Sequence, residues 1–179
     1  FNVVVSDVDE TVEHGESPAA HVMRLSVLKA RDVGARLGKG IVIGADTIVV
    51  LDGDILGKPS SPGHAVAMLG RLQGRTHRVY TDFAIHDPET GRTLADYEAT
   101  DVDIRPMTEE MRRQYVATGE PMDKAGAYGI QGFGSALVTS VRGCYFTVMG
   151  LPLSKLAEAL HAFSDGRISY FGPCPESST

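Results

Sequence analysis

The sequence predicts an α/β fold: a single domain around a mixed sheet that contains hairpins, with helices flanking the sheet. Two observations predict this class. Strand-like apolar runs alternate with helical periodicities along the chain, and several neighbouring strand candidates are joined by turns short enough for antiparallel pairing. The length of 179 residues suits one core, and no repeat or linker divides it.

The chain opens with a predicted strand and a predicted helix. The stretch "FNVVVS", residues 1–6, is an apolar run rich in valine, as strands are. A helix is expected to follow, because Ser17 suits an N-cap, Pro18 suits the first turn, and apolar residues then recur at helical spacing. Gly38 or Gly40 is expected to end that helix.

A buried strand and a second helix come next. Residues 41–51 are almost wholly apolar and predict the strand. The Asp52-Gly53 dipeptide behind them is a strong signal for a two-residue hairpin turn that leads into "DILG". The pair Ser61-Pro62 repeats the helix-opening signal, and Gly74 is expected to end the second helix.

The middle of the chain predicts two longer strands and a third helix. Residues 77–87 and 93–104 alternate well enough for two strands, which the "DPETG" turn joins. Thr108 is an N-cap candidate because acidic residues fill the first turn behind it. Gly119 and Pro121 then mark the end of this helix.

The last part of the chain predicts another hairpin and a final helix. The runs "SALVTSV" and "CYFTVMG", residues 135–141 and 144–150, are expected to pair across Arg142-Gly143. Residues 152–163 have one apolar stripe at helical spacing and predict a helix. Residues 164–179 are expected to be a C-terminal tail.

Composition and charge exclude several classes of protein. The formal net charge is -6 and the 17 Lys and Arg residues are scattered, so no nucleic-acid surface is expected. No apolar run approaches the roughly 20 residues of a membrane helix, so no membrane partner is expected. Cys144 and Cys174 lie far apart with no Cys or His at metal-ligand spacing, which favours a reducing, cytoplasmic setting without zinc.

Asp46 is the most informative residue because it interrupts the apolar strand of residues 41–51. A carboxylate there needs a partner, since burying it alone is costly or shifts its pKa. Gly44 permits close approach to the backbone, Thr47 adds a hydroxyl, and Lys58 follows in the hairpin. These neighbours predict an anion and metal site. The alternative is a carboxylate bonded only to the backbone or to a structural lysine.

Two other phosphate motifs are matched only in part. The stretch "VVVSDVDETV" has the form of a haloacid dehalogenase-type phosphatase opening, with Asp7 as nucleophile and Asp9 as acid. Its pattern is incomplete, because Lys58 stands where a second acid would sit, and the alternative is a strand that ends in a solvated acidic loop. The stretch "GDILGKP" misses the P-loop spacing by one residue and has Pro59 in place of Ser or Thr.

The segment "DKAGAYGIQGFG", residues 123–134, has too much glycine for a helix or a strand. Its glycines expose backbone N–H groups to a ligand, and Lys124 supplies a charge for phosphate. The Gln131 amide has both a donor and an acceptor, so it matches the carbonyl and the imide N–H of uracil or thymine. A plain glycine loop is the alternative.

Three segments in this order, "IGADTIVVLDGDILGKP", "YVATGEPMDKAGAYGIQG" and "GLPLSKL", closely resemble the Maf family of nucleoside triphosphate pyrophosphatases. The resemblance runs from Phe1 to about Phe163, and its "GADT" and "GIQG" motifs are similar to the branch that acts on dTTP and UTP. It implies a Maf/ITPase-like fold over residues 1–163. It also implies hydrolysis of a nucleoside triphosphate to the monophosphate and pyrophosphate, with Mg²⁺ or Mn²⁺.

The resemblance further implies roles for individual residues. Asp46 matches the catalytic base and a metal ligand, and Glu10 matches an acid near the metal. Thr47 and Gln131 match residues that influence base choice. Three lysines match positions around the substrate: Lys29, Lys58 and Lys124.

The resemblance sets the remaining expectations. The family's N-terminal strand and its Ser-x-Ser-Pro-Arg-Arg phosphate loop are expected before Phe1, and the tail of residues 164–179 has no family counterpart. A homodimer is expected. The rival hypothesis from another class is a nucleotide-binding regulator of cell division that does not catalyse a reaction.

Overall fold

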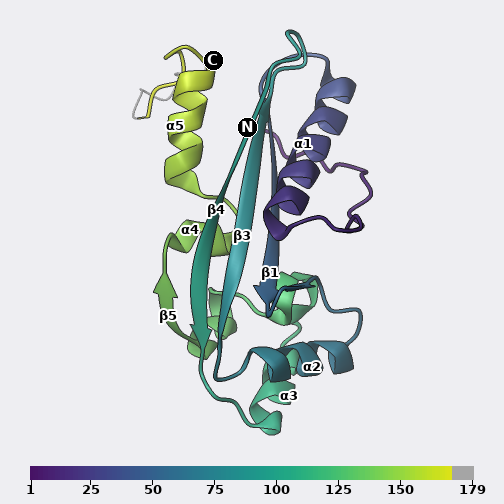
Figure 1. The fold of residues 1–179 in the computed structure, drawn as a ribbon, viewed down its shortest axis with the longest axis vertical. Helices are drawn as coiled ribbons and strands as arrows, with labels where there is room; N and C mark the ends of the chain where they lie inside the picture. The colour runs from purple at the N-terminus through teal and green to yellow at the C-terminus, as the bar shows by residue number, and fades with distance from the viewer. Residues whose placement is uncertain (171–179) are drawn as a thin grey trace, which may run out of the picture.

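Five strands form the sheet at the centre of the structure, a computed structural model that describes residues 1–170 (Figure 1). Their order is β2-β1-β3-β4-β5, and every neighbouring pair is antiparallel. The strands are β1 (Val42–Leu51), β2 (Asp54–Leu56), β3 (Thr76–His86), β4 (Thr93–Ile104) and β5 (Val138–Arg142). The predicted α/β class and its hairpins are confirmed. The described strands contain no parallel pair, however, so this part of the sheet is antiparallel and not mixed.

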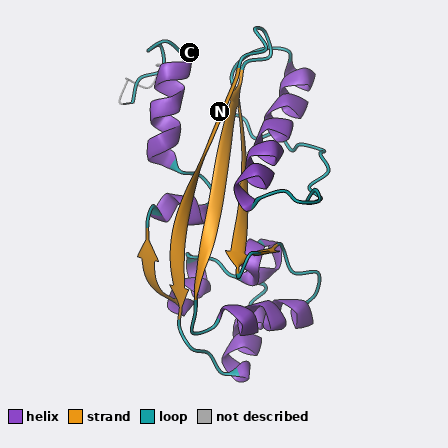
Figure 2. Cartoon of the chain, in the orientation of Figure 1, coloured by secondary structure: helices purple, strands orange, loops and turns teal. Residues whose placement is uncertain are grey.

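Helices cover both faces and the lower end of the sheet (Figure 2). In the view of Figure 1, α1 and α5 flank the upper halves of the long strands, and α2 and α3 lie together below them. The α-helices are α1 (Pro18–Leu37), α2 (Pro62–Leu72), α3 (Glu109–Ala117), α4 (Tyr145–Met149) and α5 (Leu153–Phe163). Three short 3-10 helices complete the described elements: η1 (Glu120–Asp123), η2 (Ala125–Ala127) and η3 (Gly132–Leu137).

Strand β3 shows why both faces of the sheet are covered. Its apolar residues alternate in direction, as strand geometry requires. Ala84 packs with Val42 and with α1, whereas Phe83 and Ile85 pack with α5. The lower halves of the strands pack on α2 and α3 in a third and larger cluster.

The three predicted helix starts are confirmed by their caps. Ser17 accepts a hydrogen bond from the N–H of Ala20 (3.2 Å), and Ser61 accepts one from the N–H of His64 (3.1 Å). Thr108 caps α3 in the same way. These caps satisfy N–H groups that the helix leaves unpaired. The predicted end of α1 is also confirmed, because Gly38 adopts the left-handed backbone there with φ 71°.

Two predicted strands are wrong. Residues 1–6 form no strand and stay largely exposed, because they pair with none of the described strands. Residues 145–149 form α4 instead of the second arm of a hairpin. Strand β5 pairs with β4 instead, with Val141 opposite Val102, so tertiary pairing overrides the β-propensity of "CYFTV".

The first residue of the predicted tail is packed within the domain. Ser164 is buried, and its hydroxyl accepts a hydrogen bond from the N–H of Ile168 (2.9 Å). Residues 171–179 of the predicted tail lie outside the described residues. Among residues 1–170, no helix combines the length and the apolar composition needed to span a bilayer.

Candidate active site

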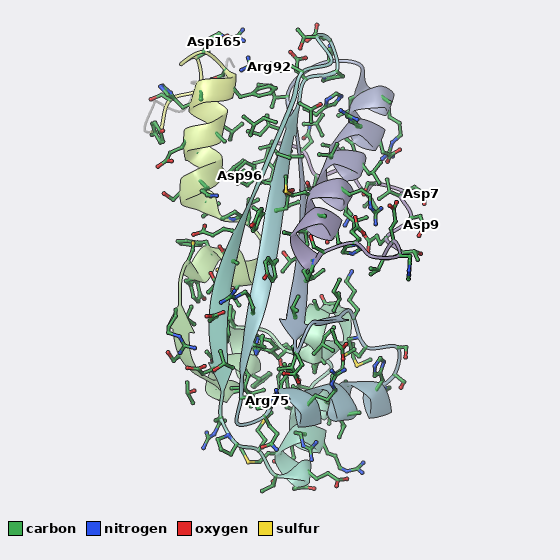
Figure 3. All side chains as sticks on the ribbon, in the orientation of Figure 1. Asp7, Asp9, Arg75, Arg92, Asp96 and Asp165 are labelled. Carbon is green, nitrogen blue, oxygen red and sulfur yellow. The ribbon has the colours of Figure 1, made fainter. Side chains whose placement is uncertain are left out.

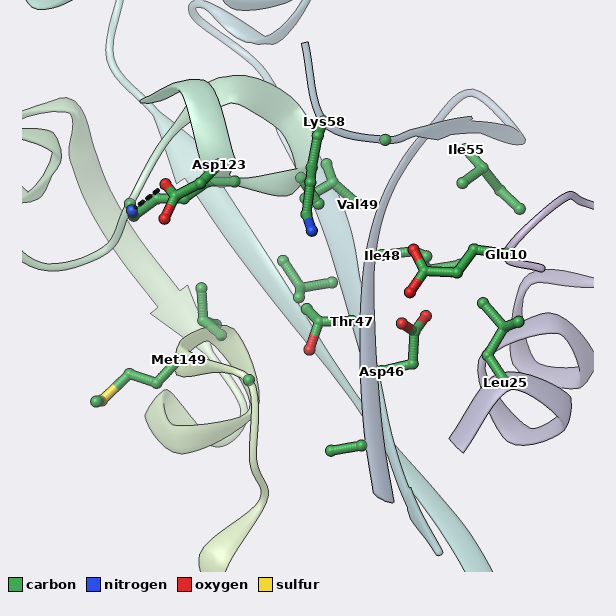
Figure 4. A pocket seen from close by; sticks show the side chains of 18 of the residues that line it. Glu10, Leu25, Asp46, Thr47, Ile48, Val49, Ile55, Lys58, Asp123 and Met149 are labelled. Atoms are coloured by element: carbon green, nitrogen blue, oxygen red, sulfur yellow. Dashed lines mark hydrogen bonds and ion pairs between the residues drawn. The ribbon is translucent and has the colours of Figure 1, made fainter. Parts of the chain in front are cut away.

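A cavity of about 600 Å³ lies between α1, β1 and the glycine-rich segment of residues 123–131 (Figure 4). Every site residue predicted from the sequence lines it: Glu10, Lys29, Asp46, Thr47, Lys58, Lys124 and Gln131. These residues come from five separate parts of the chain, so the fold brings them together. The roles predicted for them are not tested by this arrangement alone.

Strand β1 delivers two neighbouring polar residues to one cavity because its edge is open there. Side chains of consecutive strand residues point to opposite faces, so Asp46 faces α1 and Thr47 faces α4. Strand β2 pairs with β1 only from Val49 to Leu51. No other described strand continues that edge past Asp46 and Thr47, and the cavity reaches both faces around it.

The Asp46 carboxylate is paired with Lys29, not with Lys58. The Lys29 ammonium lies 2.8 Å from Asp46 Oδ1 and 2.6 Å from Glu10 Oε1, so it bridges two carboxylates. Burial opposes the charge of Lys29, but the two carboxylates outweigh it and raise its pKa. For Asp46, burial raises the pKa of the carboxyl, and the contact with Lys29 offsets this rise only in part. Asp46 is therefore a more basic carboxylate than an exposed one.

Helix α1 contributes more to the cavity than the sequence indicated. His21, Leu25 and Lys29 all line it. Their spacing of four residues places them on one face of the helix. His21 was not among the site residues predicted from the sequence, although its helical spacing from Lys29 could have indicated it. The imidazole is buried and lies 3.0 Å from the Glu16 carboxylate.

The other two lysines differ in their partners. Lys124 Nζ lies 2.7 Å from Asp123 Oδ1 and donates to the carbonyl oxygen of Glu120 at 3.2 Å. Lys58 is exposed and has no hydrogen bond or ion pair with any described residue. Figure 4 shows its side chain reaching into the cavity toward Asp46 and Thr47. Lys58 is therefore the lysine most available to an anionic ligand.

The hydrogen bonds around Thr47 determine whether its hydroxyl donates or accepts. Thr81 donates its only hydroxyl proton to the carbonyl oxygen of Thr147 (2.6 Å). The Thr47 and Thr81 oxygens lie 2.9 Å apart, so Thr47 is the donor in that contact. Its oxygen consequently keeps acceptor lone pairs for a ligand in the cavity.

Gln131 lies at the rim of the cavity with an exposed side chain. It is the N-cap residue of η3, yet its side chain makes no capping hydrogen bond. The amide has no hydrogen-bond partner among residues 1–170. Both its donor and its acceptor are therefore free to meet a ligand.

Two sequence hypotheses do not match the structure. Asp7 and Asp9 lie on the N-terminal loop at the side of the molecule, as Figure 3 shows, and neither lines the cavity. The haloacid dehalogenase-type arrangement also lacks the strand that would deliver Asp7. Gly44 permits close approach, as predicted, but the group that approaches is the backbone of α1 at Ser26 and Ala30.

The donor set for a metal consists of two carboxylates, Glu10 and Asp46, which point toward each other in Figure 4. Within the described part of the chain, no group of three or more His, Cys, Asp or Glu residues is arranged to hold an ion. Mg²⁺ commonly takes one or two protein carboxylates and completes its octahedron with water and substrate phosphates. The residues present fit that mode of binding.

Comparison with known proteins assigns the family. The family model described as "Maf-like protein" matches residues 1–163. A protein of Desulforamulus reducens named dTTP/UTP pyrophosphatase is 48% identical over 163 residues, which cover 91% of this chain and 85% of that protein. Proteins of the same name from Symbiobacterium thermophilum and Bacillus cytotoxicus are 49% and 46% identical, covering 91% and 93% of this chain and 83% and 86% of their own lengths. The chain belongs to the Maf-like protein family.

Proposed function

We propose that this protein hydrolyses nucleoside triphosphates, with dTTP and UTP preferred, to the nucleoside monophosphate and pyrophosphate. The observation that carries the proposal is one cavity that joins a basic, half-buried carboxylate to three lysines and a free amide. The names of the relatives support the same reaction and the same substrates.

The charges in the cavity support a need for a divalent cation. Its three carboxylates balance its three lysines: Glu10, Asp46 and Asp123 against Lys29, Lys58 and Lys124. Two of the lysines are already paired with these acids. A triphosphate adds several negative charges that one unpaired lysine does not neutralise. Mg²⁺ or Mn²⁺ held by Glu10 and Asp46 would supply that charge and act as a Lewis acid on the phosphates.

Asp46 is assigned as the general base that orients and deprotonates the attacking water. Its raised pKa suits this role, because a more basic carboxylate accepts a proton more readily. Lys29 holds Asp46 in place, while Lys58 and Lys124 contact the phosphates. A point charge does not distinguish one base from another, so these lysines are expected to serve every triphosphate alike.

Base choice is assigned to Gln131 and Thr47. Uracil and thymine present a carbonyl and an imide N–H, whereas cytosine presents an amine and an unprotonated nitrogen. The Gln131 amide can donate to the carbonyl of the former bases. Thr47 offers an acceptor and not a donor, as its contact with Thr81 requires, so we assign it to the ring imide N–H, where cytosine has an unprotonated nitrogen. Together the two residues favour uracil and thymine over cytosine.

Product analysis on the full-length protein tests the proposed reaction. UTP or dTTP with Mg²⁺ is expected to yield monophosphate and pyrophosphate in equal amounts. Binding without turnover would instead indicate the nucleotide-binding regulator, and release of orthophosphate would indicate a phosphatase. Either result would overturn the proposal.

Asp46→Asn tests the assigned base within that assay. The change keeps the shape of the side chain and removes its charge, so kcat/KM for UTP is expected to fall by about 100-fold or more. Asp7→Asn is the matched control, because Asp7 is an exposed acid outside the cavity, and it is expected to keep full activity. Retained activity in Asp46→Asn would remove Asp46 from the chemistry.

The family resemblance also leads us to propose a homodimer in the cytoplasm. Light scattering on the purified protein measures the number of copies directly, and a monomer at micromolar concentration would contradict the dimer.

A further inference from the structure

Glu120 is the residue around which the glycine-rich segment is organised. Its Oε2 accepts a hydrogen bond from the backbone N–H of Phe133 (2.8 Å), and its Oε1 accepts one from the N–H of Gly134 (2.8 Å). Tyr115 donates its hydroxyl to Oε1 as well (2.8 Å). One carboxylate therefore binds three donors, two of which are backbone groups in η3.

Tyr115 extends this contact to the other side of Gln131. Its hydroxyl oxygen accepts a hydrogen bond from the N–H of Gly129 (3.1 Å) while its proton goes to Glu120. The backbone is therefore held at Gly129, two residues before Gln131, and at Phe133, two residues after it. Tyr115 is itself buried, so this support belongs to the core.

The glycines of the segment leave room for these contacts. A Cβ on Gly132 would collide with the carboxylate of Glu120, and Gly132 has a positive φ of 64°. A Cβ on Gly134 would lie 2.6 Å from the Tyr115 hydroxyl. The glycines thus let Glu120 and Tyr115 approach the backbone, which is a different use from the direct contact with a ligand that the sequence suggested.

Glu120 also explains why the Gln131 side chain is free. The first N–H groups of a helix need an acceptor, and the N-cap residue usually supplies it. Here Gln131 occupies the N-cap position of η3 without capping it, because Glu120 accepts from Phe133 and Gly134 in its place. Burial opposes the charge of Glu120, but these hydrogen bonds outweigh it and keep the pKa of the carboxyl below its usual value.

We propose that Glu120, supported by Tyr115, is a positioning residue for base selection, which fixes the backbone around Gln131 and leaves its amide free for the base. This inference rests on the proposed function. The backbone carbonyl of Glu120 also accepts from Lys124, so the same residue connects the base side of the cavity with the phosphate side.

The test is Glu120→Gln, which keeps the size of the side chain but turns an NH₂ donor toward groups that are themselves donors. The preference for UTP over CTP in kcat/KM is expected to fall by roughly tenfold. Inhibition by pyrophosphate, which has no base, is expected to stay unchanged, because the backbone contact with Lys124 remains. A general loss of structure would weaken both. Glu110→Gln is the matched control, an exposed acid that contacts Gln114 on α3.

Tyr115→Phe is the second variant in case Glu120→Gln folds poorly. It removes one hydroxyl that joins Gly129 to Glu120, so a smaller loss of base preference in the same direction is expected. An unchanged ratio of UTP to CTP in both variants, with a selective wild-type protein, would overturn the proposal.

Amide hydrogen exchange without substrate separates this proposal from the proposed function. The amides of Phe133 and Gly134 are expected to exchange faster in Glu120→Gln than in wild type or Glu110→Gln. Unchanged exchange would overturn the positioning role whatever the enzyme does. A wild-type protein that treats UTP and CTP alike would overturn base reading, and with it the selective role of Glu120, even where exchange changes as expected.

Discussion

At the scale of the residue, the direction in which the Thr81 hydroxyl donates its proton determines how Thr47 can bind a ligand. Thr47 and Thr81 are cross-strand partners on β1 and β3, and Thr81 is fully buried. Because the Thr81 proton is committed to the carbonyl of Thr147, Thr47 is the donor between the two. Thr81 does not line the cavity, yet its contacts leave Thr47 able to accept a hydrogen bond from a ligand and unable to donate one.

Thr81→Val removes that constraint while keeping the shape of the side chain. Thr47 loses its acceptor and is free to turn its proton toward the base, so the preference for UTP over CTP is expected to fall about fivefold to tenfold. Thr81→Ser retains the hydroxyl and is expected to retain the preference. The measurement is kcat/KM for both nucleotides in the three proteins. A wild-type ratio in Thr81→Val would show that Thr47 does not read the base.

At the scale of the element, the placement of α1 against β1 makes the ion pair at the centre of the site. Gly44 lies where the backbone of α1 passes closest to the strand, near Ser26 and Ala30. Without a Cβ at that point, α1 lies close enough for Lys29 to reach Asp46 two residues further along β1. The distance between α1 and β1 therefore determines whether the Lys29 ammonium can reach the Asp46 carboxylate.

Gly44→Ala tests this dependence. The added Cβ would collide with the carbonyl of Ser26 and lie 2.8 Å from the N of Ala30, so α1 has to move away. The free energy of unfolding is expected to fall by about 1–3 kcal/mol, and kcat/KM is expected to fall with it. Gly63→Ala on α2 is the control, because nothing lies within 4 Å of its Cβ. Urea denaturation and kinetics on both variants decide, and equal behaviour of the two would contradict the role of Gly44.

The elements that sequence predicts well are those whose signals are local. Helix starts at Ser17, Ser61 and Thr108 depend on contacts within one turn, so their caps could be named in advance. The hairpin expected at residues 135–150 failed because β5 finds its partner in β4, some forty residues earlier. Pairing over such a distance leaves no periodic mark in either segment.

The same limit applies within the site. An acid inside an apolar strand has to have a partner, so Asp46 was predictable from β1 alone. Its partner was not, because Lys29 comes from α1 and Lys58 is nearer in sequence. Glu120 was missed for a related reason, since its three donors lie before and after it in the chain and no residue type marks such a contact.

At the scale of the whole molecule, the sheet contains a second buried acid besides Asp46, and this one is paired with no cation among the described residues. Asp82 on β3 lies opposite Asp46 in the strand register and is fully buried. Its Oδ1 contacts the hydroxyl of Ser26, and its Oδ2 has no hydrogen-bond partner among residues 1–170. Burial raises the pKa of Asp82 to about 7, and the neighbouring Asp96 and Asp46 act in the same direction. Below about pH 7 the native protein therefore favours the protonated carboxyl.

This acid links the stability of the fold to pH. The carboxyl ionises near pH 3.8 when it is free of these surroundings, so between about pH 4 and 7 the native state binds a proton that the unfolded state does not. The stabilisation is present in full below pH 3.8 and is lost as the pH rises through about 7. The contribution of Asp82 to the free energy of unfolding thus falls by up to about 1.4 kcal/mol for each pH unit in that window.

Asp82→Asn isolates this contribution because the amide cannot ionise and keeps nearly the same shape. The free energy of unfolding of the variant, relative to wild type, is expected to rise between about pH 4.5 and 7.5. Urea denaturation in metal-free buffer across that range measures the difference. Asp54→Asn serves as the control, since this acid is exposed and paired with Arg71 at the surface. A difference between Asp82→Asn and wild type that stays constant with pH would mean that Asp82 is ionised in the native protein. Its charge would then have to be compensated by a group other than Ser26.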